Sequence, residues 1–315
     1  MSMKRFRVAE DSMLPTLRPG DEFLATSTVT PELGDIISFP HPARDDFWLV
    51  KRVAEPPEPI DEGHVWVLSD NHEMTHADSR TLGQIDVTTA MTAVTHLNAT
   101  TFVEGCELLC GEDDALARAV ELFGVPEFWH REPGFQCLVL LILEQQVSLE
   151  SGAAVYRRLD QASGGIAPES LVRLGVDGMR SIGTTRQKAG YLMTLSEMSI
   201  DGRFDVDALA DDTPARAREK LLEISGIGPW TADAYLLSAL RIPDMWPVGD
   251  RALQVGASEV LGLSKIPTEA ELEVLAEPWR PARSVAARII WHSYLSARGR
   301  VEPPDPTQHS KPEST

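Results

Sequence analysis

A short glycine-containing turn between two helical patterns constrains the fold of this chain most strongly. Residues 222–232 read Leu-Glu-Ile-Ser-Gly-Ile-Gly-Pro-Trp-Thr-Ala, so Gly226 and Gly228 flank a single apolar residue, Ile227. A tight hairpin of this kind leaves backbone N–H groups unpaired at the start of a helix, where the helix dipole favours anions. The run therefore predicts a phosphate-binding hairpin that needs no basic side chain.

An aspartate follows this hairpin at a distance of one helix. Asp250 lies twenty residues after Trp230, in the run Pro-Val-Gly-Asp-Arg, where Pro247 and Gly249 predict a loop just before the next helix. Two interpretations stay open for Asp250. It is either a carboxylate held ready for chemistry beside a bound nucleic-acid backbone, or a helix N-cap.

The hairpin, Trp230 and Asp250 together resemble the helix–hairpin–helix DNA glycosylases, in particular the 3-methyladenine DNA glycosylase II type. The resemblance covers about residues 110–298 and implies an all-α domain. It also implies that Asp250 is catalytic, because a carboxylate stabilises the oxocarbenium-like transition state of base excision and can orient water. Relatives that also cut the DNA strand carry a Schiff-base Lys at the position of Trp230. The resemblance therefore implies a monofunctional enzyme.

The same resemblance implies which residues contact DNA. Trp291 matches an aromatic residue that stacks on the flipped base, so Trp230 and Trp291 are expected to form the base pocket, although both could be core residues. Gln145 and Gln146 precede the segment that fills the gap left by the base, or they simply end a helix. The expected DNA-binding residues are Gly226, Ile227, Gly228, Trp230, Thr231, Gln145 and Gln146.

Two further features of the helical half bear on this expectation. Residues 185–189 (Thr-Arg-Gln-Lys-Ala) resemble a family segment that opens a helix, and they are expected to contribute to the fold and to phosphate contact. The family has an aromatic residue four positions after Trp230, whereas this chain has Ala234 followed by Tyr235. The lesion preference therefore stays open.

The first 87 residues have a β-strand pattern. Short apolar runs at 22–26, 35–39, 47–53 and 64–68 are separated by Pro and Gly, which predicts a small, coiled, mostly antiparallel sheet. Residues 11–21, 50–53 and 69–83 resemble the nucleophile, lysine and closing boxes of signal-peptidase-like Ser–Lys proteases, of the soluble nickel superoxide dismutase maturation type.

This second resemblance implies a Ser–Lys dyad. Ser12 would be the nucleophile and Lys51 the general base, its pKa lowered by burial. Lys51 is then expected to be buried with its amine about 3 Å from Ser12 Oγ. The closing box departs from the family, because six residues separate Asn71 from Asp78 and Ser69 replaces a Gly. A fold retained without activity is the alternative.

Composition limits the remaining possibilities. The formal charge of −19 argues against a protein that coats DNA through basic side chains, so contact must be local. Three cysteines form neither a disulfide framework nor an iron–sulfur site, and we expect no metal and no cofactor. No apolar run reaches the roughly 18–20 residues that span a bilayer, and no signal peptide is evident, so we expect a cytoplasmic chain without membrane contact.

The sequence therefore predicts an α+β protein of two domains, a small β-rich signal-peptidase-like domain followed by an all-α helix–hairpin–helix glycosylase domain. The expected boundaries are 1–87 for the peptidase-like domain, 88–109 for a linker, 110–298 for the glycosylase domain and 299–315 for a disordered tail. The expected partner is double-stranded DNA with alkylated bases, and a peptide or precursor protein for the N-terminal domain. The alternative is a soluble maturation peptidase with a helical DNA-binding module, and a third reading is a fusion of two independent activities.

Overall fold

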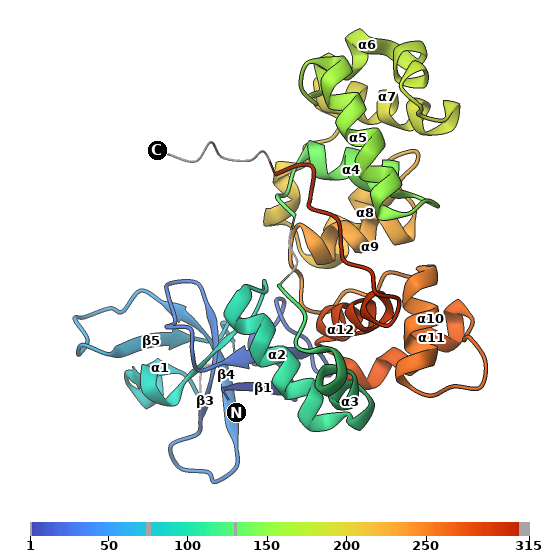
Figure 1. Ribbon diagram of the computed structural model, residues 1–315. Helices are drawn as coiled ribbons and strands as arrows, with labels where there is room; N and C mark the ends of the chain where they lie inside the picture. The colour runs from blue at the N-terminus through green and yellow to red at the C-terminus, as the bar shows by residue number, and fades with distance from the viewer. Residues whose placement is uncertain (1, 74–76, 129–130, 309–315) are drawn as a thin grey trace, which may run out of the picture.

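A computed structural model describes residues 2–73, 77–128 and 131–308 of the chain. A curved β-sheet formed by the first part of the chain lies beside a larger assembly of helices (Figure 1). In the described part of the chain, no helix is long and apolar enough to cross a membrane.

The sheet has seven strands in the order β1-β2-β7-β3-β4-β5-β6, and all of its pairings are antiparallel. Buried and half-buried residues alternate along β4, as expected of a strand with one face on a core. Phe6 of β1 and Trp48 of β4 lie with ring centroids 5.2 Å apart although their strands are not neighbours, so the sheet coils on itself. The strands are β1 Met3–Arg7, β2 Glu22–Thr26, β3 Ile36–Pro40, β4 Trp48–Ala54, β5 His64–Leu68, β6 Ile85–Asp86 and β7 Met91–Ala93.

The helical half consists of short helices, and several of them begin at a capping threonine. Thr185, Thr213 and Thr268 each accept a hydrogen bond from a backbone N–H in the first turn of the helix that follows. The helices are α2 Ala99–Glu112, α3 Asp114–Phe123, α4 Phe135–Glu144, α5 Leu149–Ser163, α6 Pro168–Ser181, α7 Arg186–Ile200, α8 Pro214–Leu222, α9 Pro229–Ser238, α10 Arg251–Val260, α11 Glu269–Ala276 and α12 Arg283–Ser296. Helix α1, Ser79–Leu82, and four 3₁₀ turns complete the described elements: Asp11–Met13, Val87–Thr89, Asp207–Asp211 and Glu277–Trp279.

The predicted linker at 88–109 is wrong. Strand β7 lies in this segment and pairs with both β2 and β3, so the sheet is incomplete without it. Helix α2 then starts at Ala99, because Asn98 and Thr101 form a reciprocal capping box. The sheet therefore extends to Ala93 and passes almost directly into the helices.

The predicted disordered tail is wrong for residues 299–308, and residues 309–315 lie outside the described part. The Glu302 carboxylate pairs with the buried Arg288 guanidinium of α12 at 2.8 Å, and Thr307 is only 8% exposed. Figure 1 shows the chain leaving α12 and running back toward α4. The polar, Pro-rich composition predicts disorder, but a buried arginine needs a counter-charge, and this segment supplies it.

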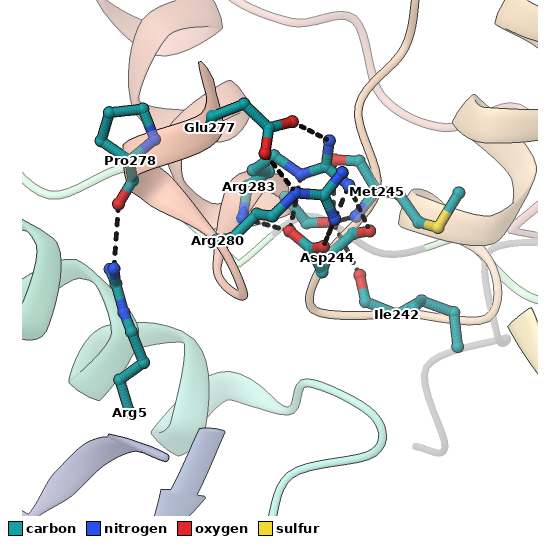
Figure 2. Close-up of polar contacts among 9 residues, drawn as sticks. Arg5, Ile242, Asp244, Met245, Glu277, Pro278, Arg280 and Arg283 are labelled. Carbon is teal, nitrogen blue, oxygen red and sulfur yellow. Dashed lines mark hydrogen bonds and ion pairs between the residues drawn. The ribbon is translucent and has the colours of Figure 1, made fainter. Parts of the chain in front are cut away.

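Part of the sheet packs into the apolar core of the helices, while the rest forms a separate cluster around Ile37 and Val67. Met3 and Leu24 of the sheet belong to the same buried cluster as Phe102 of α2. Polar bonds cross the same boundary, because Thr26 Oγ1 donates to the buried Glu104 carboxylate at 2.7 Å. The Arg5 guanidinium donates to the carbonyl of Pro278, near α12 (Figure 2). The sheet is therefore packed against the helices rather than tethered to them.

Candidate functional site

The glycine hairpin lies between α8 and α9, as the sequence predicts. Gly226 has φ +94°, and a Cβ there would lie 2.1 Å from Cγ of Tyr191, so this position accepts only glycine. Gly228 is the N-cap of α9 with φ −92°, and nothing lies within 4 Å of a Cβ built on it. The backbone therefore presents the N-terminus of α9 to open space, where an anion can approach closely.

Asp250 is the N-cap of α10 and also the centre of a polar cluster. Its Oδ1 accepts a hydrogen bond from the backbone N–H of Leu253 at 2.7 Å, which is the bond expected of a helix N-cap. The same oxygen accepts the indole N–H of Trp291 at 3.1 Å, and Oδ2 accepts that of Trp230 at 2.8 Å. The two interpretations of Asp250 are therefore compatible, because one carboxylate caps a helix and faces both predicted pocket tryptophans.

The two tryptophans come from different helices. Trp230 is in the first turn of α9, directly after the hairpin, and Trp291 is in α12. Both are half-buried and pack against the edge of the large core, so the core-packing alternative is true of part of each ring. The structure thus brings together three predicted site residues that lie up to 61 positions apart, from Trp230 to Trp291.

The two glutamines have different surroundings. Gln145 donates its amide to the carbonyl of Gly226 at 2.7 Å and to Thr231 Oγ1 at 2.9 Å, so it connects the end of α4 to the hairpin. Gln146 is exposed in the left-handed region, with φ +58°. Lys188 of α7 is half-buried and donates to the carbonyls of Leu143 and Gln145 at 2.7 and 2.8 Å. The loop is therefore fixed at its base and exposed at its tip.

Other predicted DNA-binding side chains point inward. Ile227 is 4% and Thr231 1% exposed, so their side chains cannot reach a ligand. Ala234 is also buried, and the hydroxyl of its neighbour Tyr235 accepts the backbone N–H of Gly134 at 3.0 Å. Tyr235 therefore does not replace the aromatic residue that Ala234 lacks.

An ion-pair cluster supports the site and was not identified from the sequence. Asp244 lies in the loop that leads to Asp250, and it accepts bonds from Arg280 at 2.7 Å and from Arg283 at 2.7 and 2.9 Å. Glu277 adds a bond to Arg280 at 2.9 Å (Figure 2). Because Arg283 begins α12, the cluster holds the loop bearing Asp250 against the helix that carries Trp291. The sequence signal was only two arginines three positions apart.

The sheet carries the second predicted site. Lys51 of β4 is 2% exposed, and its amine donates to Ser12 Oγ at 2.9 Å and to the Val50 carbonyl at 2.9 Å. The expected burial and separation are therefore confirmed. Burial lowers the pKa of Lys51, and the negative charges of Asp78, Glu10 and Asp70 oppose that shift. A buried amine of this kind can take a proton from a hydroxyl.

The closing box surrounds this dyad despite its extra residue. The backbone N–H of Asn71 donates to the Ser12 carbonyl at 3.0 Å. Burial alone would raise the pKa of Asp78, but bonds from the Arg80 side chain and from the backbone N–H groups of Ser69 and Arg80 outweigh it and lower the pKa. Residues 74–76, in the segment between Asn71 and Asp78 that contains the extra residue, lie outside the described part. A groove of about 170 Å³ opens at Ser12 and Lys51.

Comparisons with known proteins divide the chain in the same way. Residues 139–281 match the family described as HhH-GPD superfamily base excision DNA repair protein, so this part of the helical half is similar to domains of this kind. Residues 1–57 match the family described as signal peptidase, peptidase S26. The second match is short. It supports a signal-peptidase-like fold for the sheet but does not test a peptidase activity.

Individual relatives match the helical half. A DNA-3-methyladenine glycosylase of Bacillus subtilis is 24% identical over 184 residues, which are 55% of this chain and 59% of that protein. DNA-3-methyladenine glycosylase 1 of Schizosaccharomyces pombe is 26% identical over 208 residues, 64% of this chain and 91% of that protein. The crystal structure of a DNA-3-methyladenine glycosidase from Bacillus halodurans is 29% identical with a TM-score of 0.53, covering 64% of this chain and 92% of that one. The chain spans less than two thirds of the B. subtilis relative.

Proposed function

We propose that the helical half is a monofunctional DNA glycosylase that removes alkylated bases of the 3-methyladenine type in base excision repair. The observation that carries the proposal is the position of Asp250. This carboxylate lies beside Trp230 and Trp291, one helix after an open hairpin suited to phosphate. The names of the glycosylase relatives support the substrate class.

The geometry suits hydrolysis of an N-glycosidic bond. The hairpin backbone holds a phosphate at the N-terminus of α9, and the exposed tip at Gln146 fills the space that the flipped base leaves. The tryptophan rings stack on the electron-poor alkylated base, an interaction related to cation–π attraction. As the bond to the base breaks, the Asp250 carboxylate stabilises the positive sugar and orients the water that completes hydrolysis.

Double-stranded DNA is the proposed partner, and its contact with the protein is local. The chain carries a formal charge of −19, so a broad electrostatic attraction to phosphate is absent. Backbone N–H groups at one helix end can bind a phosphate without any basic side chain. We therefore expect weak binding to undamaged DNA.

An excision assay tests the proposal. Purified protein is incubated with duplexes that carry single 3-methyladenine, 7-methylguanine, hypoxanthine or 8-oxoguanine bases, and abasic sites are then cleaved with alkali. Alkali-dependent strand breaks at alkylated bases are the expected result. Excision of none of these bases at enzyme excess would overturn the proposed function.

A second candidate function rests on the dyad in the sheet. The 2.9 Å bond between Lys51 Nζ and Ser12 Oγ, with Lys51 buried, is the arrangement that activates a serine nucleophile. Lys51 would take the hydroxyl proton while Ser12 Oγ attacks a peptide carbonyl, and would pass that proton to the amine that leaves as the C–N bond breaks. Water would then hydrolyse the acyl-enzyme and release the acid and the free serine. We propose a peptide or precursor protein as the substrate of this site.

A peptide library digest tests the second function. Mass spectrometry should detect cleavage products with the wild-type chain and none with Ser12→Ala or Lys51→Ala. Thr16→Ala is the matched control, because Thr16 lies in the same box but contacts Arg52 rather than the dyad. Cleavage that survives both dyad substitutions, or no cleavage by the wild type, would indicate a fold retained without activity. Cleavage without base excision would instead favour a peptidase with a DNA-binding module.

A further inference from the structure

Two indole N–H groups converge on one carboxylate in the helical half. Trp230 of α9 donates to Oδ2 of Asp250 at 2.8 Å, and Trp291 of α12 donates to Oδ1 at 3.1 Å. The backbone N–H of Leu253 in α10 also donates to Oδ1, at 2.7 Å. Donors from three different helices therefore fix the plane of this carboxylate.

The arrangement distinguishes the two oxygens. An ionised carboxylate offers about four lone-pair positions, two on each oxygen. Among the described residues, Oδ1 of Asp250 accepts two hydrogen bonds and Oδ2 accepts one. The remaining position is on Oδ2, which is therefore the oxygen that can face the sugar or a water molecule.

We infer that Trp230 and Trp291 are positioning residues, which hold the Asp250 carboxylate through their ring edges in addition to any stacking by their faces. This inference rests on the proposed glycosylase function. An indole donates through one edge of its ring, so this hydrogen bond does not use the aromatic face with which a ring stacks on a base. One pair of side chains can thus both receive the base and orient the catalytic group.

Contacts next to the two tryptophans fix the orientation of their indole rings. Asp244 binds Arg280 and Arg283, which holds the start of α12 against the loop before Asp250 (Figure 2). At the other side, the Gln145 amide bonds to Thr231, the neighbour of Trp230. A fixed hydrogen-bond donor stabilises developing charge without reorganisation during the reaction.

Phenylalanine substitutions distinguish hydrogen bonding by the edge of each indole ring from stacking by its face. Trp230→Phe and Trp291→Phe keep an aromatic ring but remove the N–H. Each should lower the single-turnover excision rate constant about tenfold, the effect of one hydrogen bond to a charged group, and leave the affinity for DNA within about twofold. Trp279→Phe is the matched control, because that indole donates to a different carboxylate, Asp113, at 2.8 Å. Excision by both pocket variants at the wild-type rate, or a loss confined to DNA affinity, would overturn the inference.

Indole NMR signals test the same contacts without enzyme activity. The chain has seven tryptophans, and the signals of Trp230 and Trp291 are assigned from the spectra of their Phe variants. Asp250→Asn should shift both of these signals and leave that of Trp279 unchanged, whereas Asp113→Asn should do the reverse. If neither pocket signal moves in Asp250→Asn, the inference fails, even if excision is normal. If both move but the wild type excises no base, the contacts stand and the proposed function fails.

Discussion

The surroundings of the two candidate sites favour different charge states of the central residue, an ionised carboxylate in one and a neutral amine in the other. Asp250 is half-buried, and every bond recorded for its carboxylate in the described residues comes from an N–H donor, which stabilises an anion. Lys51 is 2% exposed, and burial lowers its pKa, which favours a neutral amine. Base excision requires a negative charge beside a cationic sugar, whereas activation of a serine requires an uncharged base. The comparison shows how hydrogen-bond donors favour the charged form of a group at one site, and how burial favours the neutral form of a group at the other.

The sites also differ in how the chain assembles them. Ser12 and Lys51 belong to one small sheet, and the strand and its neighbouring turn bring them together. Asp250 needs Trp230 and Trp291, which reach it from separate helices. The helical site therefore depends more on tertiary packing, and its contacts are harder to read from sequence.

Removing the charge of Asp250 should have the largest effect. Asp250→Asn keeps the shape of the side chain but removes the negative charge that, in the proposed function, faces the sugar. The single-turnover excision rate constant should fall about a hundredfold, or by about 3 kcal/mol of transition-state stabilisation, while DNA binding stays nearly intact.

Asp113 offers a matched control for that substitution. It is also an N-cap that accepts backbone N–H groups and an indole N–H, that of Trp279. Asp113→Asn should therefore cost similar local stability but leave the excision rate unchanged. Excision by Asp250→Asn within about threefold of the wild type would mean that Asp250 is only a helix cap.

The sequence predicted local elements better than tertiary contacts. The glycine hairpin and the strands at 22–26 and 64–68 lie where their local patterns place them, and the Ser12–Lys51 contact is the one that the family resemblance implies. The hairpin and the strands depend on neighbouring residues and on short-range geometry. The bonds from both indoles to Asp250 and from Gln145 to Gly226 depend on how whole helices pack, which a single sequence does not encode in any local pattern.

The errors of prediction have the same cause. The segment 88–109 looks like a linker because its strand has only three residues, and that strand is recognisable only from its partners β2 and β3. Residues 299–308 look disordered because they are polar and rich in proline, but Glu302 is drawn to a buried arginine of α12. In both places a tertiary contact outweighs local composition.

Adding a negative charge to the hairpin should have the next largest effect. Gly228 has an ordinary negative φ and open space around it, so Gly228→Asp can fold, and aspartate is a good N-cap. Its carboxylate would occupy the helix N-terminus that a phosphate needs. Affinity for damaged and undamaged DNA should fall together by about tenfold, measured by fluorescence anisotropy.

Ala167→Asp provides the control for charge. Ala167 is the N-cap of α6 and makes no side-chain capping bond, so the substitution adds the same charge at another helix start. We expect its DNA affinity to match the wild type. Unchanged affinity in a folded Gly228→Asp protein would show that the hairpin is not the DNA contact. The comparison of the two sites would then no longer include phosphate binding by the helical site.

The buried lysine should produce a smaller effect, visible as a pH dependence of stability. Because the pKa of folded Lys51 is lowered from 10.5, the unfolded chain binds more protons between the two values. The burial penalty is constant below the folded pKa and disappears as pH rises toward 10.5. The free energy of unfolding of the wild type, relative to Lys51→Met, should therefore rise with pH across this window in urea titrations. A difference that stays constant would mean that Lys51 is not desolvated.

The smallest expected effect is an absence of strand cleavage. Lys188 is the amine of the helical half that most resembles Lys51, because burial lowers its pKa as well. It nevertheless donates N–H bonds to the carbonyls of Leu143 and Gln145, so its amine is held against the loop. The family resemblance puts Trp230 where strand-cutting relatives carry a Schiff-base lysine. Borohydride should trap no covalent adduct with abasic or lesion-bearing DNA.

Trp230→Lys supplies the positive control for this experiment, because it puts an amine beside Asp250 at the position where related enzymes form a Schiff base. A trapped adduct in that variant and none in the wild type would show that no amine of the wild-type helical half reacts with DNA, which leaves the sheet as the half with a candidate catalytic amine. An adduct in the wild type that disappears in Lys188→Met would instead place a reactive amine in both halves. The contrast between a charged helical site and a neutral-amine sheet site would then be wrong, since burial of a lysine would serve covalent chemistry in each.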